Sequence, residues 1–217
     1  MRNRDSDDYY NMLQSKKIKK CAEDYGEPTE ERVWTEVDIN KSQVKSLLSS
    51  VDREGMQDLI AWLEQSDYFT APASTIHHGA FEGGLCDHCL EVMRLFNEVN
   101  LHILNCAHAD TVIICSLLHD LCKVGAYKKF IKEQKIIYRH TENHVSRYYH
   151  ATLSLDIIEG FIDLTPLEHD IILYHMGLFG CYGRYCEYTS KELHNAIAEN
   201  CLVQIFASCD TEEAHSC

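Results

Sequence analysis

The pattern of apolar and polar positions predicts a helical protein from about residue 41 onward. Apolar residues between Val44 and Leu63 are expected to form one or two short helices. A clearer pattern follows, in which apolar side chains recur at alternating steps of four and three: Leu85, Cys89, Val92, Phe96 and Val99. These positions share one face of a helix, and this face should pack against a core.

The segment from Asp110 to Lys123 is nearly all apolar and should form the most buried helix, ending before Gly125. Two polar residues, His119 and Asp120, close this apolar run. Burying them is costly unless other groups pair with them. The pair is therefore a candidate for a functional role.

The remaining pattern predicts a hairpin and then more helices. Two short apolar runs around a polar turn indicate a β-hairpin over residues 127–139. Helices are expected over about 150–163 and from the capping box at Thr165, with Pro166 in its first turn, to His175. A second capping box at Thr189 should open a last helix that ends at Asp210.

Length and composition indicate one domain. The chain has 217 residues, of which 45% are hydrophobic, and this suffices for one well-buried core. We expect a polar N-terminal arm over residues 1–40 and an all-α helical bundle with a small β-hairpin insertion over 41–217. No run approaches the roughly 20 apolar residues that a membrane span needs. The charged N-terminus is unlike a secretory signal, and the odd number of cysteines, 11, favours reduced thiols and a cytoplasmic protein.

The charge is unevenly distributed along the chain. A net charge of −14 disfavours indiscriminate binding to nucleic acid. Yet the segment from Lys123 to Arg147 holds seven lysines and arginines against two glutamates. This segment could face an anionic substrate, or it could be a solvated hairpin whose lysines discourage edge pairing.

Histidine and aspartate residues stand at the ends or on the inner faces of the predicted helices. These residues are His88, His119, Asp120, His150, His175 and Asp210. A helix bundle can bring such side chains together at one core site, and imidazole with carboxylate suits magnesium or a divalent transition metal. Each histidine taken alone is more often structural. Cys181 and Cys186 are badly spaced for a zinc knuckle and have no second matching pair.

Three motifs resemble those of the HD-domain metal-dependent phosphohydrolase superfamily. Segment 83–92, Gly-Gly-Leu-Cys-Asp-His-Cys-Leu-Glu-Val, is similar to the first motif, whose histidine is a metal ligand. Segment 116–123, Ser-Leu-Leu-His-Asp-Leu-Cys-Lys, is similar to the defining motif, and segment 207–210 to the closing one. The resemblance covers about residues 46–215. Residues 71–73 and His77-His78 are typical of the branch that contains oligonucleotide 3′–5′ exoribonucleases.

The resemblance implies a metal centre with up to two ions. His88, His119, Asp120 and Asp210 would hold the first ion. His150 and His175 would contribute to a second, with Asp120 as the bridging catalytic carboxylate. Several such enzymes have two consecutive histidines at the position of His175, and here the second is Met176. One or two ions of manganese, magnesium, iron, cobalt or nickel are therefore expected per chain.

The resemblance also implies the residues that contact substrate. Lys123 would act on the phosphoryl group, and its other possible role is that of a cation at a helix end. His77 and His78 would contact substrate from their loop, unless they are exposed histidines without a role. Arg147 in the basic segment completes the expected substrate-binding set.

The expected function is metal-dependent hydrolysis of a phosphate monoester or diester. The expected partner is a small phosphorylated substrate, a nucleotide or a short oligonucleotide. Candidates are a nucleotide phosphohydrolase, a cyclic nucleotide phosphodiesterase and an exonuclease for short oligonucleotides. The alternative is a non-catalytic regulatory or interaction module that keeps the HD fold and the metal. The sequence leaves the exact substrate and the oligomeric state open.

Overall fold

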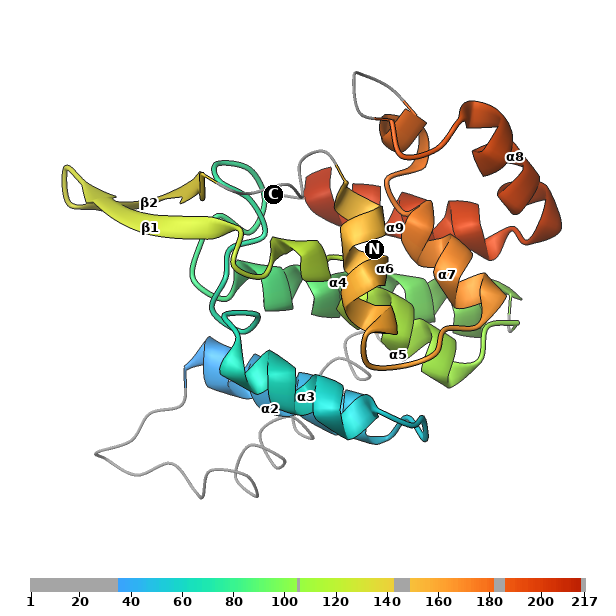
Figure 1. The fold of residues 1–217 in the computed structure, drawn as a ribbon, viewed down its shortest axis with the longest axis horizontal. Coiled ribbons are helices and arrows are strands. Elements are labelled where there is room, and N and C mark those ends of the chain that lie inside the picture. The colour runs from blue at the N-terminus through green and yellow to red at the C-terminus, as the bar shows by residue number, and fades with distance from the viewer. Residues whose placement is uncertain (1–34, 105, 143–148, 182–185, 216–217) are drawn as a thin grey trace, which may run out of the picture.

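A computed structural model describes residues 35–104, 106–142, 149–181 and 186–215. The described chain is mostly helical, with one two-stranded antiparallel sheet (Figure 1). The predicted all-α fold with a hairpin insertion is thereby confirmed in its secondary structure. Within these ranges, no helix combines the length and the apolar character that a membrane crossing requires.

The described elements follow one another as helices, with the hairpin inserted midway. Their order is α2 (Glu36–Ser49), α3 (Met56–Gln65), α4 (Gly84–Val99), η1 (Asn100–Leu104), α5 (Ala109–Leu118), η2 (Leu121–Lys123), β1 (Tyr127–Lys132), β2 (Lys135–His140), α6 (His150–Glu159), α7 (Pro166–Leu173), η3 (Gly177–Cys181), α8 (Ser190–Glu199) and α9 (Leu202–His215).

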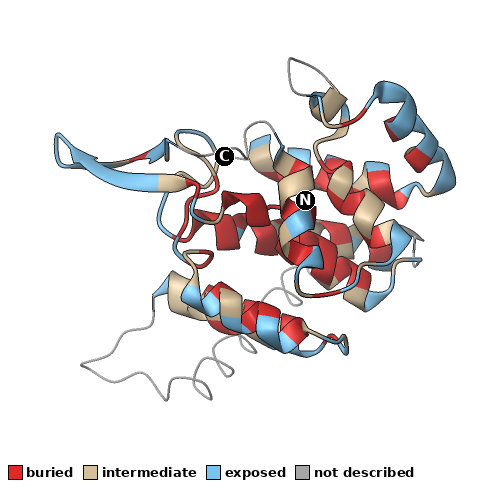
Figure 2. Cartoon of the chain, in the orientation of Figure 1, coloured by how far each residue is buried: buried red, intermediate tan, exposed pale blue. Residues whose placement is uncertain are grey.

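Helix α4 lies at the centre of the bundle. It packs against α2, α5 and α9, while α7 packs against α5, α6 and α9. Buried residues concentrate on α4 and α5, and the outer faces of α8 and the hairpin are exposed (Figure 2). The apolar stripe predicted on α4 is part of this core, where Phe96 meets Phe206 of α9 edge-on with ring centroids 5.2 Å apart.

The most buried helix is shorter than the apolar pattern predicts. Helix α5 ends at Leu118 rather than at Lys123. Asp120 leaves the helical conformation with φ −106° and ψ 21°, and the short 3₁₀ turn η2 follows. The backbone N–H of Lys123 then donates to the Asp120 carbonyl at 2.9 Å. His119 and Asp120 therefore lie on a tight buried turn and not within a helix.

The sequence predicts a single last helix from Thr189 to Asp210. This prediction is wrong, because the structure has two helices there. Asn200 is extended, with φ −150° and ψ 116°, and it separates α8 from α9. Its side-chain Oδ1 accepts the backbone N–H of Leu202 at 3.0 Å and so helps to start α9. Because α9 continues to His215, Asp210 lies inside a helix and not at its end.

The helical part of the chain begins before the expected boundary at residue 41. Helix α2 starts at Glu36, and the side chains of Thr35 and Asp38 form a capping box with the backbone. Residues 1–34 of the predicted polar arm lie outside the described residues.

The predicted β-hairpin is present and projects from the helices (Figure 1). Its strands pair in register from Tyr127 with His140 to Lys132 with Lys135. Glu133 and Gln134 form the two-residue turn with positive φ of 51° and 64°, which suits the twist of a hairpin. At the base, the Tyr127 hydroxyl donates to the Ala73 carbonyl at 3.3 Å and anchors the hairpin to the loop before α4.

An ion pair between half-buried Arg53 and fully buried Glu168 links three parts of the bundle. The guanidinium of Arg53, which precedes α3, donates to both carboxylate oxygens of Glu168 on α7, at 2.6 and 3.2 Å. Thr111 of α5 donates its hydroxyl to the same carboxylate at 3.1 Å. Burial opposes ionisation of Glu168, but the hydrogen bonds from Arg53 and Thr165 outweigh it and lower the pKa of this carboxyl.

We expect Arg53→Met to lower the free energy of unfolding by about 2–4 kcal/mol, because it leaves a buried carboxylate without its cation. The control is Arg94→Met, since Arg94 pairs with Glu91 and Glu98 on the more exposed surface of α4. That change should cost below about 1 kcal/mol. Urea denaturation of the two variants measures both values. Equal losses of unfolding free energy would show that the Arg53–Glu168 pair stabilises the fold no more than the exposed pairs of Arg94 do.

Candidate metal centre

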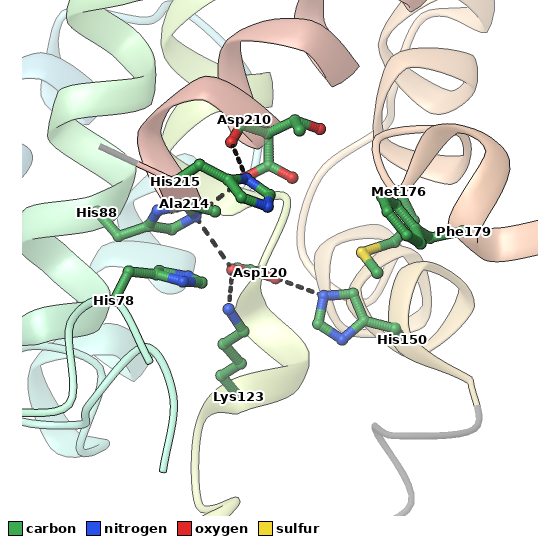
Figure 3. Close-up of a pocket in the computed structure, with 11 residues that line it drawn as sticks. His78, His88, Asp120, Lys123, His150, Met176, Phe179, Asp210, Ala214 and His215 are labelled. Atoms are coloured by element: carbon green, nitrogen blue, oxygen red, sulfur yellow. Dashed lines mark hydrogen bonds and ion pairs between the residues drawn. The ribbon is translucent and has the colours of Figure 1, made fainter. Parts of the chain in front are cut away.

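Side chains from five separate segments meet around Asp120, and Figure 3 shows His88, His150 and Asp210 beside it. His88 comes from α4, and His119 and Asp120 come from the turn after α5. His150 is the first residue of α6, and Asp210 comes from α9. His175 follows α7 and is 1% exposed. The helix packing thus brings together all six residues that the sequence singles out as metal ligands.

The first group of side chains surrounds a space that fits one ion. Asp210 Oδ1 lies 3.1 Å from His88 Nε2 and 3.5 Å from His119 Nε2. Asp120 Oδ2 lies 3.4 and 3.6 Å from the same two nitrogens. Ligand atoms bonded to one ion at about 2.1 Å are about 3.0–3.4 Å apart. The observed separations are close to these values.

The second oxygen of Asp120 faces a different pair of histidines. Asp120 Oδ1 lies 2.6 Å from His150 Nε2 and 3.8 Å from His175 Nε2. Asp120 therefore stands between the His88–His119 side and the His150–His175 side, with one oxygen toward each. This is the arrangement of a carboxylate that could bridge two ions.

Hydrogen bonds to backbone carbonyls determine which ring nitrogen of His119 and of His175 faces the other groups of the centre. His119 Nδ1 lies 3.0 Å from the Ser116 carbonyl, and His175 Nδ1 lies 2.6 Å from the Ile172 carbonyl. A carbonyl only accepts, so both Nδ1 atoms donate to their carbonyls, and the Nε2 atoms are the ones that face Asp120. Second-sphere partners of this kind orient metal-binding imidazoles.

The Nε2 atom of His175 is the strongest single observation in favour of an ion or a substrate atom at this centre. It is buried and has no hydrogen-bond partner within the described ranges. Burial lowers the pKa of His175 to about 3, with a further contribution from His119 and His150, so the ring is neutral near pH 7. A buried polar atom without a partner is costly, and an ion or a substrate atom would satisfy it.

The charges at the centre favour ionised carboxylates. Burial opposes ionisation of Asp120, but Lys123 and the nearby histidines outweigh it and hold its pKa well below the usual range. Lys123 Nζ lies 2.5 Å from Asp120 Oδ2, and this contact helps to raise the pKa of the lysine despite its burial. Two carboxylates and four imidazoles form a donor set for a divalent cation.

Glu213 is a buried residue of the centre that the sequence interpretation missed. Its carboxylate contacts His88 Nδ1, and the opposite nitrogen of His88 faces Asp120 and Asp210. The spacing offers a signal, because Glu213 stands three residues after Asp210 and residues at this spacing share a helix face. Carboxylate–histidine–metal contacts of this type recur in metal sites.

Glu187 is a second residue that the sequence interpretation missed. The N-cap of α6, Tyr149, makes no side-chain capping bond. Instead, the Glu187 carboxylate accepts the backbone N–H groups of Ala151 and Thr152 at 3.1 and 2.8 Å. A carboxylate from a distant loop thus caps the helix whose first residue is His150. No local sequence pattern reveals such a contact.

The thiol of Cys122 lies beside the centre but on its outer side. Its Sγ is 3.4 Å from His150 Nδ1, whereas His150 Nε2 faces Asp120. Cys122, Asp120 and His150 lie close enough to be a ligand group, as do His78, His88 and Glu213. The thiol contact restricts the orientation of the His150 ring, as the Glu213 contact does for His88.

A pocket of about 190 Å³ opens onto the centre. Lys123 and His78 line it, as the sequence predicts for substrate-contacting residues. His77 is exposed and does not line the pocket. Arg147 lies outside the described residues. The structure therefore brings two of the four predicted substrate residues to the candidate site.

Nothing matches this chain in comparisons with protein-family models, with curated proteins and with solved structures. The buried His/Asp cluster could hold a metal ion, and its geometry alone supports that interpretation.

We expect Glu213→Ala to weaken Mn²⁺ binding by about 10–100-fold, the usual effect of losing a second-sphere partner of a metal ligand. The matched control is Glu212→Ala, because Glu212 is the exposed neighbour on the same helix. Isothermal titration of both variants and of the wild type gives the affinities. An unchanged affinity in Glu213→Ala would exclude a role for this carboxylate in orienting His88.

Proposed function

We propose that the protein is a metal-dependent phosphohydrolase of the HD type. Its substrate would be a phosphate monoester or diester of a nucleotide or short oligonucleotide. The buried, unpartnered Nε2 of His175 beside Asp120 is the observation that carries this proposal. The atom belongs to a set of imidazole and carboxylate groups, and the separations between Asp210 and the His88–His119 pair suit a divalent ion.

The arrangement of the three sequence motifs supports the HD assignment. The histidine of the first motif, the His-Asp pair and the closing aspartate come from three elements that are distant in the sequence. The resemblance requires them to meet, and His88, His119, Asp120 and Asp210 lie within mutual contact. This convergence supports the HD assignment.

The chain's own groups would bind and orient the phosphoester. A divalent ion held here would lower the pKa of a coordinated water and stabilise charge on the phosphoryl oxygens. Lys123 lies at the pocket with its ammonium against Asp120 Oδ2, where it can also reach a phosphoryl oxygen. His78 lines the same pocket and can donate a hydrogen bond to the substrate.

The test is turnover and metal content of the wild type against Asp120→Asn. We expect the wild type to hydrolyse nucleotides or nitrophenyl phosphate esters with manganese, magnesium, iron, cobalt or nickel. Asp120→Asn removes the anionic charge between the histidines, so turnover should fall by at least about a hundredfold. Elemental analysis should show loss of the metal, and circular dichroism should show a folded protein.

The control for this test is Asp156→Asn, which changes an exposed aspartate on α6. It should retain metal and turnover. Metal bound by the wild type without any hydrolysis would instead identify the non-catalytic HD module. Absence of metal binding in the wild type would reject the proposal altogether.

The two-sided position of Asp120 generates a separate prediction about the number of ions. Its two carboxylate oxygens face different histidine pairs, so we expect two ions per chain, about 3.5–4 Å apart. His175→Ala should reduce the content from two ions to one under saturating metal, as measured by elemental analysis. One ion in both proteins would assign His150 and His175 to substrate contact.

A further inference from the structure

The pocket has two walls of different chemistry. Asp120, Lys123 and His78 form one wall, and the imidazole of His150 lies beyond Asp120 (Figure 3). Met176 and Phe179 form the other, on the opposite side of Asp120 from His78 and His88 (Figure 3). The Phe179 side chain is 69% exposed although it borders a functional pocket. None of the groups proposed for phosphate chemistry needs such a wall.

The segment that carries Phe179 is held firmly in place. Gly177, at the start of η3, has φ +52°, and its carbonyl accepts the hydroxyl of Tyr188 at 2.8 Å. Gly180 packs so tightly on the Tyr188 ring that a Cβ there would come within 2.3 Å of the hydroxyl oxygen. Tyr188 is itself buried and meets Tyr174 edge-on. The exposed position of Phe179 is thus imposed by packing on both sides of it.

We propose that Phe179 forms a base-stacking subsite, in which the nucleobase of the substrate lies against its ring while the phosphate lies at the metal centre. This inference rests on the proposed function and assigns its substrate class. An exposed aromatic face next to a thioether suits a planar aromatic group, because stacking on such a ring accepts any base. The polar wall opposite supplies the groups that an anionic phosphate requires.

A substitution of the neighbouring residue Leu178 distinguishes the loss of base stacking from a general loss of exposed apolar surface. It is 50% exposed on the same short segment but does not line the pocket. A substitution there removes a similar apolar area and leaves the pocket wall intact. Leu178→Ala is therefore the matched control for Phe179→Ala.

The kinetic test compares a nucleoside 5′-phosphate with ribose 5-phosphate, which lacks only the base. Phe179→Ala should raise KM for the nucleotide by about 5–100-fold, the range expected for one stacked base, and leave kcat unchanged. KM for ribose 5-phosphate should not change. Leu178→Ala should affect neither substrate, and Phe179→Trp should restore nucleotide affinity. Equal effects on both substrates, or none, would overturn the subsite.

A binding test separates this inference from the proposed function. In Phe179→Trp, nucleotide should quench the added indole fluorescence and ribose 5-phosphate should not, with the wild type as the background. Such quenching supports the subsite even where no hydrolysis is observed, in which case only the proposed function fails. Hydrolysis of both esters without base-dependent quenching would retain the function and overturn the subsite.

Discussion

The carboxylate of Asp120 is 1% exposed at the point where the helices of the bundle meet. An isolated charge in such a place is very costly, so the surrounding structure must supply compensating groups. Lys123 and His150 lie within 2.6 Å of its two oxygens, and His88 and His119 lie slightly farther away. These contacts constrain how α4, α6 and the turn after α5 can pack.

Contacts from groups outside the six candidate ligands hold the side chains of His88, His150 and His175 in their orientations. Glu213 contacts His88, Glu187 caps the helix that starts at His150, and the Ile172 carbonyl orients His175. Each comes from a segment distant in sequence from the histidine, or from the turn just before it. A metal site requires ligands held to within a fraction of an ångström, and such contacts provide that precision.

Charge is unevenly distributed, with cations near the pocket of an acidic protein. The chain carries a net charge of −14, yet Lys123 is buried beside the pocket. The lysine-rich hairpin starts four residues farther on, and Lys129 on it pairs with Glu82 at 2.7 Å. Local cations at a pocket can therefore bind a phosphate, while the net charge disfavours long nucleic acid.

Local pattern determined the helices, the hairpin and the six candidate ligands, because apolar periodicity, capping boxes and the His-Asp motif are encoded in neighbouring residues. The local pattern does not predict the break at Asn200, because apolar spacing continues across it from α8 to α9. Only the tertiary structure decided the two-sided position of Asp120, the roles of Glu213 and Glu187, and the pocket wall at Phe179. These features depend on contacts between segments far apart in the chain, and no local pattern records which segments meet.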